Sequence, residues 1–445
     1  MNIKNNNTLI KNVNKYVNKI QRSQFVNGIT GGMMAAMPIT ILGAFAALFL
    51  HLPIDGYKEF IASSGIETAL KLIVTFTTNF LAVIFCVSIA GSYAKQHDED
   101  PLFCAILAFI CFFIVTPMTI SSGSVPVINM KWLGGFGIFT GIVVSIVSTR
   151  LYIYLRLKGF TIKMPSSVPP VVSDSFSSLI PGFASIIFFT AVSVIFKFTS
   201  FGSIHQFVYS FLQIPLEGVG GNIVSIIILW TFAQLLWFVG IHGTLVIYSV
   251  VLPIFTAMDA TQLSAYAAGT ALPHITGRAF VSTYTMSASA IGFTLLMMFA
   301  SKSQRYKKMG KLTTIPALFG ISEPLVFGTP LVFNFRFFIP FIFLNAVCLA
   351  IAYFVTYIGL VPRVAGITPM AGMPIILNGI MEGSWKIAVL QVFLVLLQIV
   401  CWYPFFRKAD NESYREECED AKKEQNEDSI SDMESSRLTK VNEGE

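Results

Sequence analysis

Charged residues are scarce in this chain of 445 residues. They make up 12% of the sequence, whereas about a quarter of the residues in an ordinary soluble domain carry charge, and 54% of the sequence is apolar. A soluble fold of this length would need more charge to cover its surface. Apolar runs of about twenty residues, the length that crosses a bilayer, recur along the chain instead. We therefore predict an all-α polytopic membrane protein, placed in the plasma membrane.

Cysteine motifs are also absent from the sequence. The six cysteines show neither a CxxC pair nor the spacing of metal ligands, and five of them fall in apolar runs. No small-residue cleavage site follows the first apolar run, so we expect no cleaved signal peptide. We expect no metal and no cofactor. The basic excess outside the C-terminal tail is explained by the positive-inside bias of membrane loops, so we expect no nucleic-acid partner.

About ten transmembrane helices account for the apolar runs. We predict that spans one to five build an N-terminal membrane scaffold and dimerisation domain over residues 26–200, and that the later spans build a C-terminal substrate-binding domain over 221–406. An interfacial helix over 201–220 would connect the two domains. The predicted spans are 26–50, 67–95, 102–121, 133–155, 178–200, 221–240, 243–258, 276–300, 338–360 and 385–406.

Both ends of the chain differ from the apolar body. In the N-terminal segment 1–25, residues 9–25 mix apolar and basic side chains, which is typical of an amphipathic helix on a membrane surface. Residues 407–445 hold 13 acids and 7 bases with almost no apolar periodicity, which predicts a disordered acidic tail. Ten alternating spans put the basic loops, including 302–311, on one side with both termini. The positive-inside rule makes that side the cytoplasm.

Two apolar regions are interrupted by proline and glycine. Residues 313–337 contain Pro316, Pro324 and Pro330, and residues 361–384 have a similar composition. Proline removes a backbone donor, so such segments are tolerated at membrane depth only where protein or solvent covers them. We predict two re-entrant hairpins. The first carries the segment GISEPLVFGTP with a single acid, Glu323, and an intramembrane acid indicates a functional site.

Glu323 is the centre of a candidate binding site for a sugar. His242 stands in the segment WFVGIHG, at the join of two apolar runs and between glycines, while Trp237 and Trp385 supply flat indole faces. A carboxylate, an imidazole and aromatic faces are the groups that bind sugar hydroxyls and the apolar face of a pyranose. Further candidate hydroxyl partners are Asn334, Asn378 and His274.

Structural roles remain open for the same residues. Glu323 could cap backbone groups that Pro324 leaves open, and His242 could be an ordinary buried histidine. Trp237 and Trp385 could equally belong to the aromatic belts at the membrane interfaces. The residues alone do not choose between these roles and sugar binding.

Several motifs in order resemble one family. GISEPLVFGTP followed by LVFN, the WFVGIHG segment, IKMP with VPPVVS, and YPFF near residue 403 together resemble the IIC permease of the bacterial phosphoenolpyruvate-dependent sugar phosphotransferase system, in its lactose/cellobiose/diacetylchitobiose family. The likeness covers nearly the whole chain before the tail. Three positions depart from the family pattern: Ser166, Phe335 and the segment Ser287–Ala290.

The resemblance implies a homodimeric permease for a β-linked disaccharide. In the family the residues that match Glu323 and His242 contact the sugar near the hydroxyl that becomes phosphorylated, so these two are the expected catalytic residues. The phosphate would come from a cysteine of a separate cytoplasmic IIB protein acting in trans. Side chains at Ser287–Ala290 would occupy space that is glycine-lined in the family, which leaves the sugar open.

Two other classes of function remain open. In an ion-coupled sugar symporter, Glu323 would serve as a proton relay and no phosphodonor would be needed. A sensor that has kept the fold without transporting sugar is the third class, although the presence of both Glu323 and His242 argues against it.

Overall fold

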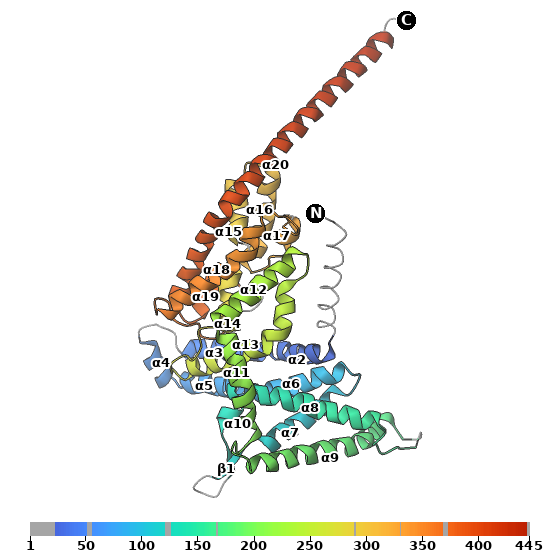
Figure 1. The fold of residues 1–445 in the computed structure, drawn as a ribbon, viewed down its shortest axis with the longest axis vertical. Helices are drawn as coiled ribbons and strands as arrows, with labels where there is room; N and C mark the ends of the chain where they lie inside the picture. Colours follow the sequence, from blue (N-terminus) through green and yellow to red (C-terminus); the bar gives the residue numbers. More distant parts are fainter. Residues whose placement is uncertain are drawn as a thin grey trace.

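A computed structural model describes residues 23–50, 56–120, 126–165, 168–288, 291–329, 331–367 and 373–442 (Figure 1). Most of the predicted amphipathic segment 1–25 lies outside these ranges. Ser166, two residues of the Ser287–Ala290 segment and residues 368–372 of the second predicted hairpin also lie outside them.

The described residues form helices and one two-stranded antiparallel sheet. The first half has α2 (Gln24–Ala35), α3 (Met37–Leu50), α4 (Tyr57–Ser63), α5 (Ile66–Thr77), η1 (Thr78–Phe80), α6 (Leu81–Lys95), α7 (Pro101–Val115), β1 (Met118–Ile120), β2 (Pro126–Ile128), η2 (Met130–Trp132), η3 (Gly135–Gly137), α8 (Ile138–Leu157) and α9 (Pro170–Lys197). The connection has α10 (Ile204–Val208), a π-helical turn η4 (Tyr209–Gln213) and α11 (Ile214–Gly221). The second half has α12 (Ile223–Phe238), α13 (Gly243–Ala267), α14 (Arg278–Ala288), α15 (Ile291–Ala300), α16 (Gln304–Leu318), α17 (Glu323–Gly328), α18 (Phe338–Tyr357), α19 (Ile375–Met381) and α20 (Trp385–Asn442).

Each predicted span has a helical counterpart. Among the described residues, six helices are long and apolar enough to cross a bilayer, and counting two bent helix pairs raises the number to eight. The bent pairs are α2 with α3, and the 204–221 helix with α12, which meet at 40° and 71°. The remaining two predicted spans correspond to the shorter apolar helices α7 and α15. The prediction of a helical polytopic membrane protein is confirmed.

One predicted span is shorter than expected. The span over 102–121 ends at Val115, and residues 118–120 form strand β1, which pairs antiparallel with β2. Pro117 explains the end of the helix, because the residue before a proline is driven from the helical to the extended region. Thr116 has a ψ of 123° in agreement with this effect.

Buried side chains gather in two large clusters. One lies among α2 and α6–α10 and also takes in Ala257 and Ala260 of α13. The other is formed by α12–α20 and by the loops that connect them. Figure 1 shows the same division, with α6–α10 in the lower part of the molecule, α15–α18 in the upper part, and α11 between them.

Residues 407–442 of the acidic tail are helical, where the sequence analysis expected disorder. α20 continues from its apolar first part through residues 407–442 without interruption. A helix that is already nucleated by packing gains a backbone hydrogen bond for each residue added, so extending it costs little free energy. Glutamate and lysine are good helix formers, and this stretch contains neither proline nor glycine.

Close packing of α15 on α16 depends on Gly310. A Cβ atom at this buried position would lie 2.4 Å from the backbone nitrogen of Met298. We expect Gly310→Ala to lower the free energy of unfolding by about 1–3 kcal/mol, because overpacking forces the helices apart. Thermal unfolding of the detergent-purified protein measures the loss. Gly218→Ala, where a Cβ meets nothing within 4 Å, is the matched control; equal melting temperatures for the two variants would contradict the packing.

Candidate functional site

The join between α12 and α13 places His242. α12 ends at Phe238, and Gly240 adopts a φ of 83°, which favours glycine. Gly243 begins α13 so close to α12 that a Cβ atom would lie 1.9 Å from the Ala233 carbonyl oxygen. The two glycines beside the histidine are therefore required by the backbone. Between them His242 caps α13, and its Nδ1 accepts a hydrogen bond of 3.3 Å from the Leu245 amide.

A helical hairpin places Glu323. α16 and α17 are joined by a tight turn in which Gly320 has a φ of 77°, and Glu323 is the first residue of α17. Pro324 follows in the first turn, where its missing amide costs nothing. The Phe333 amide donates to the Phe238 carbonyl at 2.9 Å. This bond fastens the chain after α17 to the end of α12.

His242 and Glu323 are hydrogen-bonded. His242 Nε2 lies 3.3 Å from Glu323 Oε1, although the two residues are 81 positions apart in the sequence. Since Nδ1 accepts from Leu245, the neutral imidazole carries its proton on Nε2 and donates it to the carboxylate. The side chains are 34% and 45% exposed. The carboxylate therefore keeps acceptor positions that an incoming group can reach.

Trp237 supports the imidazole. Its ring centroid lies 4.2 Å from that of His242, and its Nε1 donates to Thr244 Oγ1 at 3.2 Å. Only 4% of Trp237 is exposed, so the ring packs on the histidine instead of offering a face to solvent. The sequence analysis missed Thr244 and Leu245, and a single sequence carries no signal for them beyond their place directly after the histidine.

Asn378 and Trp385 make no described contact with this pair. Asn378 is buried on α19, and its Oδ1 accepts from Thr283 Oγ1 of α14 at 2.9 Å. Trp385 opens α20 and is 66% exposed. It is therefore an aromatic face that is open to solvent or lipid.

His274 and Asn334 also lie apart from the pair in the described contacts. His274 bonds Thr261 Oγ1 through Nε2 at 3.1 Å, and Gln262 bonds both its backbone amide and its carbonyl. Asn334 accepts from the Arg336 amide in the turn after α17. Of the predicted site residues, the structure brings together His242, Glu323 and Trp237.

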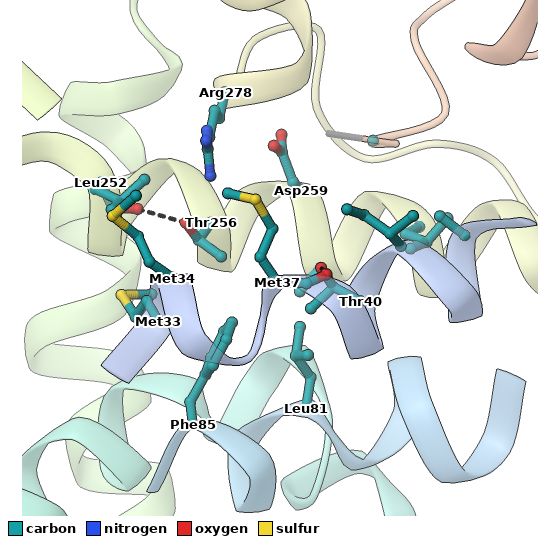
Figure 2. Close-up of a pocket in the computed structure, with 15 residues that line it drawn as sticks. Met33, Met34, Met37, Thr40, Leu81, Phe85, Leu252, Thr256, Asp259 and Arg278 are labelled. Atoms are coloured by element: carbon teal, nitrogen blue, oxygen red, sulfur yellow. Dashed lines mark hydrogen bonds between the residues drawn. The ribbon is translucent and has the colours of Figure 1, made fainter. Parts of the chain in front are cut away.

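A small cavity lies between the two halves of the molecule, away from these residues (Figure 2). Methionines from α2 and α3 line one side, and Asp259 of α13 and Arg278 of α14 both point into it from the other side. Its volume of about 40 Å³ is far below the roughly 300 Å³ at which ordinary ligand pockets begin. It does not hold a sugar in this conformation.

The chain is similar to a family of sugar transport proteins. Residues 30–344 match the family described as "Phosphotransferase system, EIIC". The oligo-beta-mannoside-specific EIIC component of Bacillus subtilis is 30% identical over 93% of this chain and 96% of its own length. The lactose-specific EIICB component of Staphylococcus aureus is 27% identical over 93% of this chain and 73% of its own length.

A crystal structure extends the likeness to the fold. The transporter ChbC, the IIC component from the N,N'-diacetylchitobiose-specific phosphotransferase system, superposes with a TM-score of 0.85. It is 32% identical in sequence, and the superposition covers 92% of this chain and 99% of that one.

The tautomer of His242 can be measured. We expect nitrogen NMR of protein labelled on histidine to show its Nε2 protonated and its Nδ1 unprotonated, because Nδ1 accepts from Leu245. His242→Gln assigns the signal by removing it. A protonated Nδ1 in the neutral ring would contradict the arrangement.

Proposed function

The chain belongs to the EIIC family of the phosphotransferase system, and from this membership we propose that it binds and translocates a β-linked disaccharide, which a separate IIB protein phosphorylates. The protein is a membrane-spanning sugar permease of the cellobiose/lactose/chitobiose type. The bonded pair of Glu323 and His242 is the single observation that carries the proposed mechanism.

The sugar class is supported by the relatives and by the chemistry of the site. The names of the oligo-beta-mannoside, lactose and diacetylchitobiose proteins all specify β-linked sugars. Glu323 offers acceptor oxygens to hydroxyl groups and is partly exposed. Measuring the binding of cellobiose, lactose and N,N'-diacetylchitobiose to the purified protein identifies which of these sugars it prefers.

Glu323 acts as the general base in the proposed reaction. Its carboxylate accepts a hydrogen bond from the sugar hydroxyl and takes the proton as the hydroxyl oxygen attacks phosphorus. The new bond joins the sugar oxygen to phosphorus, while the sulfur–phosphorus bond of the donor's phosphocysteine breaks and leaves a thiolate. His242 holds the carboxylate through Nε2–H and so fixes the direction in which its free oxygen points.

The other predicted residues have separate roles in this proposal. Trp385 is the exposed indole that a pyranose face can stack on, whereas buried Trp237 positions His242. Asn378, Asn334 and His274 become hydroxyl partners only if the surrounding helices rearrange around a bound sugar, since their described contacts are with protein.

We extend the proposal to assembly and orientation. The N-terminal half serves as a dimer scaffold, against which the C-terminal half carries the sugar as a largely rigid body. Both termini face the cytoplasm, from where IIB approaches in trans. The contact of the tail with residues 301–305 supports the placement of the tail and the basic segment 302–311 on one side.

Glu323→Gln tests the mechanism. We expect this variant to lose donor-dependent sugar phosphorylation by about 100-fold or more, the range for removal of a general base. Sugar binding weakens less, because the amide keeps one acceptor oxygen. The measurement is transfer of labelled phosphate from cysteine-phosphorylated IIB to the sugar in proteoliposomes. Glu59→Gln, an exposed acid of α4, is the control and keeps wild-type rates.

The same vesicles separate this function from proton-coupled symport. A permease of the phosphotransferase system accumulates sugar phosphate only with phosphorylated IIB, whereas a symporter accumulates free sugar when a proton gradient alone is imposed. Uptake driven by the gradient, or wild-type phosphorylation by Glu323→Gln, would overturn the proposed function.

A further inference from the structure

The base of the hairpin that carries Glu323 is bonded to the acidic start of the tail. Asp410 of α20 accepts hydrogen bonds from the Ser301 hydroxyl at 2.6 Å, the Lys302 amide at 2.8 Å and the Ser303 amide at 3.0 Å. Asp410 is only 3% exposed. Its carboxylate is therefore fully engaged in hydrogen bonds with the segment that leads into α16.

Two turns further along α20, Glu417 completes the contact. It accepts from the Ser303 hydroxyl at 2.6 Å and from the Gln304 and Arg305 amides, both at 2.9 Å. These amides belong to the first turn of α16, where the backbone N–H groups have no carbonyl acceptor within the helix. Negative charge at a helix N-terminus is favourable, so the tail caps the helix by which the hairpin begins.

The loop that follows α17 is held by a third acid. Glu412 Oε2 lies 2.5 Å from Arg336 Nη2, and the two side chains are about half exposed. A cavity of about 180 Å³ remains beside this ion pair, between Arg305, Thr329 and Glu416. Acids within eight residues of α20 therefore bind both chain segments at the base of the hairpin, the start of α16 and the loop after α17. Figure 1 shows α20 leaving the molecule beside α16.

We propose that residues 410–417 of α20 form a latch that holds the base of the Glu323 hairpin closed on the side of the tail, and that the hairpin opens to the phosphodonor when this latch releases. The inference rests on the proposed function, because it assigns the route by which the donor reaches the site. The hairpin tip is held by His242 and its base by the tail, so the base is the end that can open without breaking the catalytic pair.

The contact has a buried part at Asp410 and an exposed part at the Arg336–Glu412 pair, and its release would begin at the exposed part. The Arg336–Glu412 pair is exposed to solvent, and exposed ion pairs are weak and easily replaced. An anionic partner that approaches Arg336 and Arg305 competes directly with Glu412. The cavity already leaves space at this point for an incoming group.

The double variant Asp410→Asn/Glu417→Gln in the full chain tests the latch. We expect amide hydrogen exchange over residues 301–312 to rise at least tenfold, with no change in α6, which lies outside the contact. The kcat/KM for cysteine-phosphorylated IIB rises at least threefold, while the dissociation constant of the screened disaccharide is unchanged. Glu412→Gln, which removes only the exposed ion pair, gives the same direction with a smaller effect.

Glu419→Gln is the matched control, since it removes one charge from an exposed position of the same helix. Exchange over 301–312 equal to that of the control would overturn the latch. Faster exchange together with slower phosphorylation would also overturn it, because the bonds would then only support the active hairpin. Exchange needs no donor, so it decides the latch even if wild-type protein fails to phosphorylate sugar, a result that would refute the proposed function instead.

Discussion

The hydrogen bond between His242 and Glu323 is the constraint on which the site depends. It joins two backbone segments that are each forced into one shape. The histidine stands where Gly240 turns the chain and Gly243 lets α13 touch α12, and the glutamate stands where Gly320 turns the hairpin. The bond from Leu245 then settles which nitrogen faces the acid. A carboxylate so held has a fixed direction, which proton abstraction from a hydroxyl requires.

The same hairpin is fixed at its two ends by different chemistry. At its tip the Glu323 carboxylate is hydrogen-bonded to the imidazole of His242, and its base is capped by carboxylates of α20. The tip is set by glycine geometry, which does not vary with conditions. The base combines a buried carboxylate, Asp410, with an exposed ion pair between Arg336 and Glu412, which ions and charged partners can weaken. In the proposed latch, the base of the hairpin moves while the bond between His242 and Glu323 at its tip stays intact.

Much of this architecture was predictable from the sequence. Apolar runs, glycines and prolines are local signals, and they gave the helical membrane fold, the glycine-flanked histidine and the broken segment around Glu323. Residue chemistry placed Glu323 and His242 in one candidate sugar site, and the family resemblance implied that both contact the sugar. Contacts between polar residues that are distant in the sequence could not be predicted, because nothing near Ser301 indicates that it bonds Asp410. The burial of Trp237 against His242 was missed because tertiary packing decides it. The end of α7 at Val115 and the helix over 407–442 were also missed, although Pro117 and the helix-forming composition of the tail are local signals.

A structure with bound disaccharide tests the central claim most directly. The account predicts one sugar hydroxyl oxygen within about 3 Å of a Glu323 carboxylate oxygen, a hydrogen-bond distance, with His242 Nε2 still bonded to that carboxylate. A sugar bound elsewhere, with Glu323 turned away from it and from His242, would contradict the account.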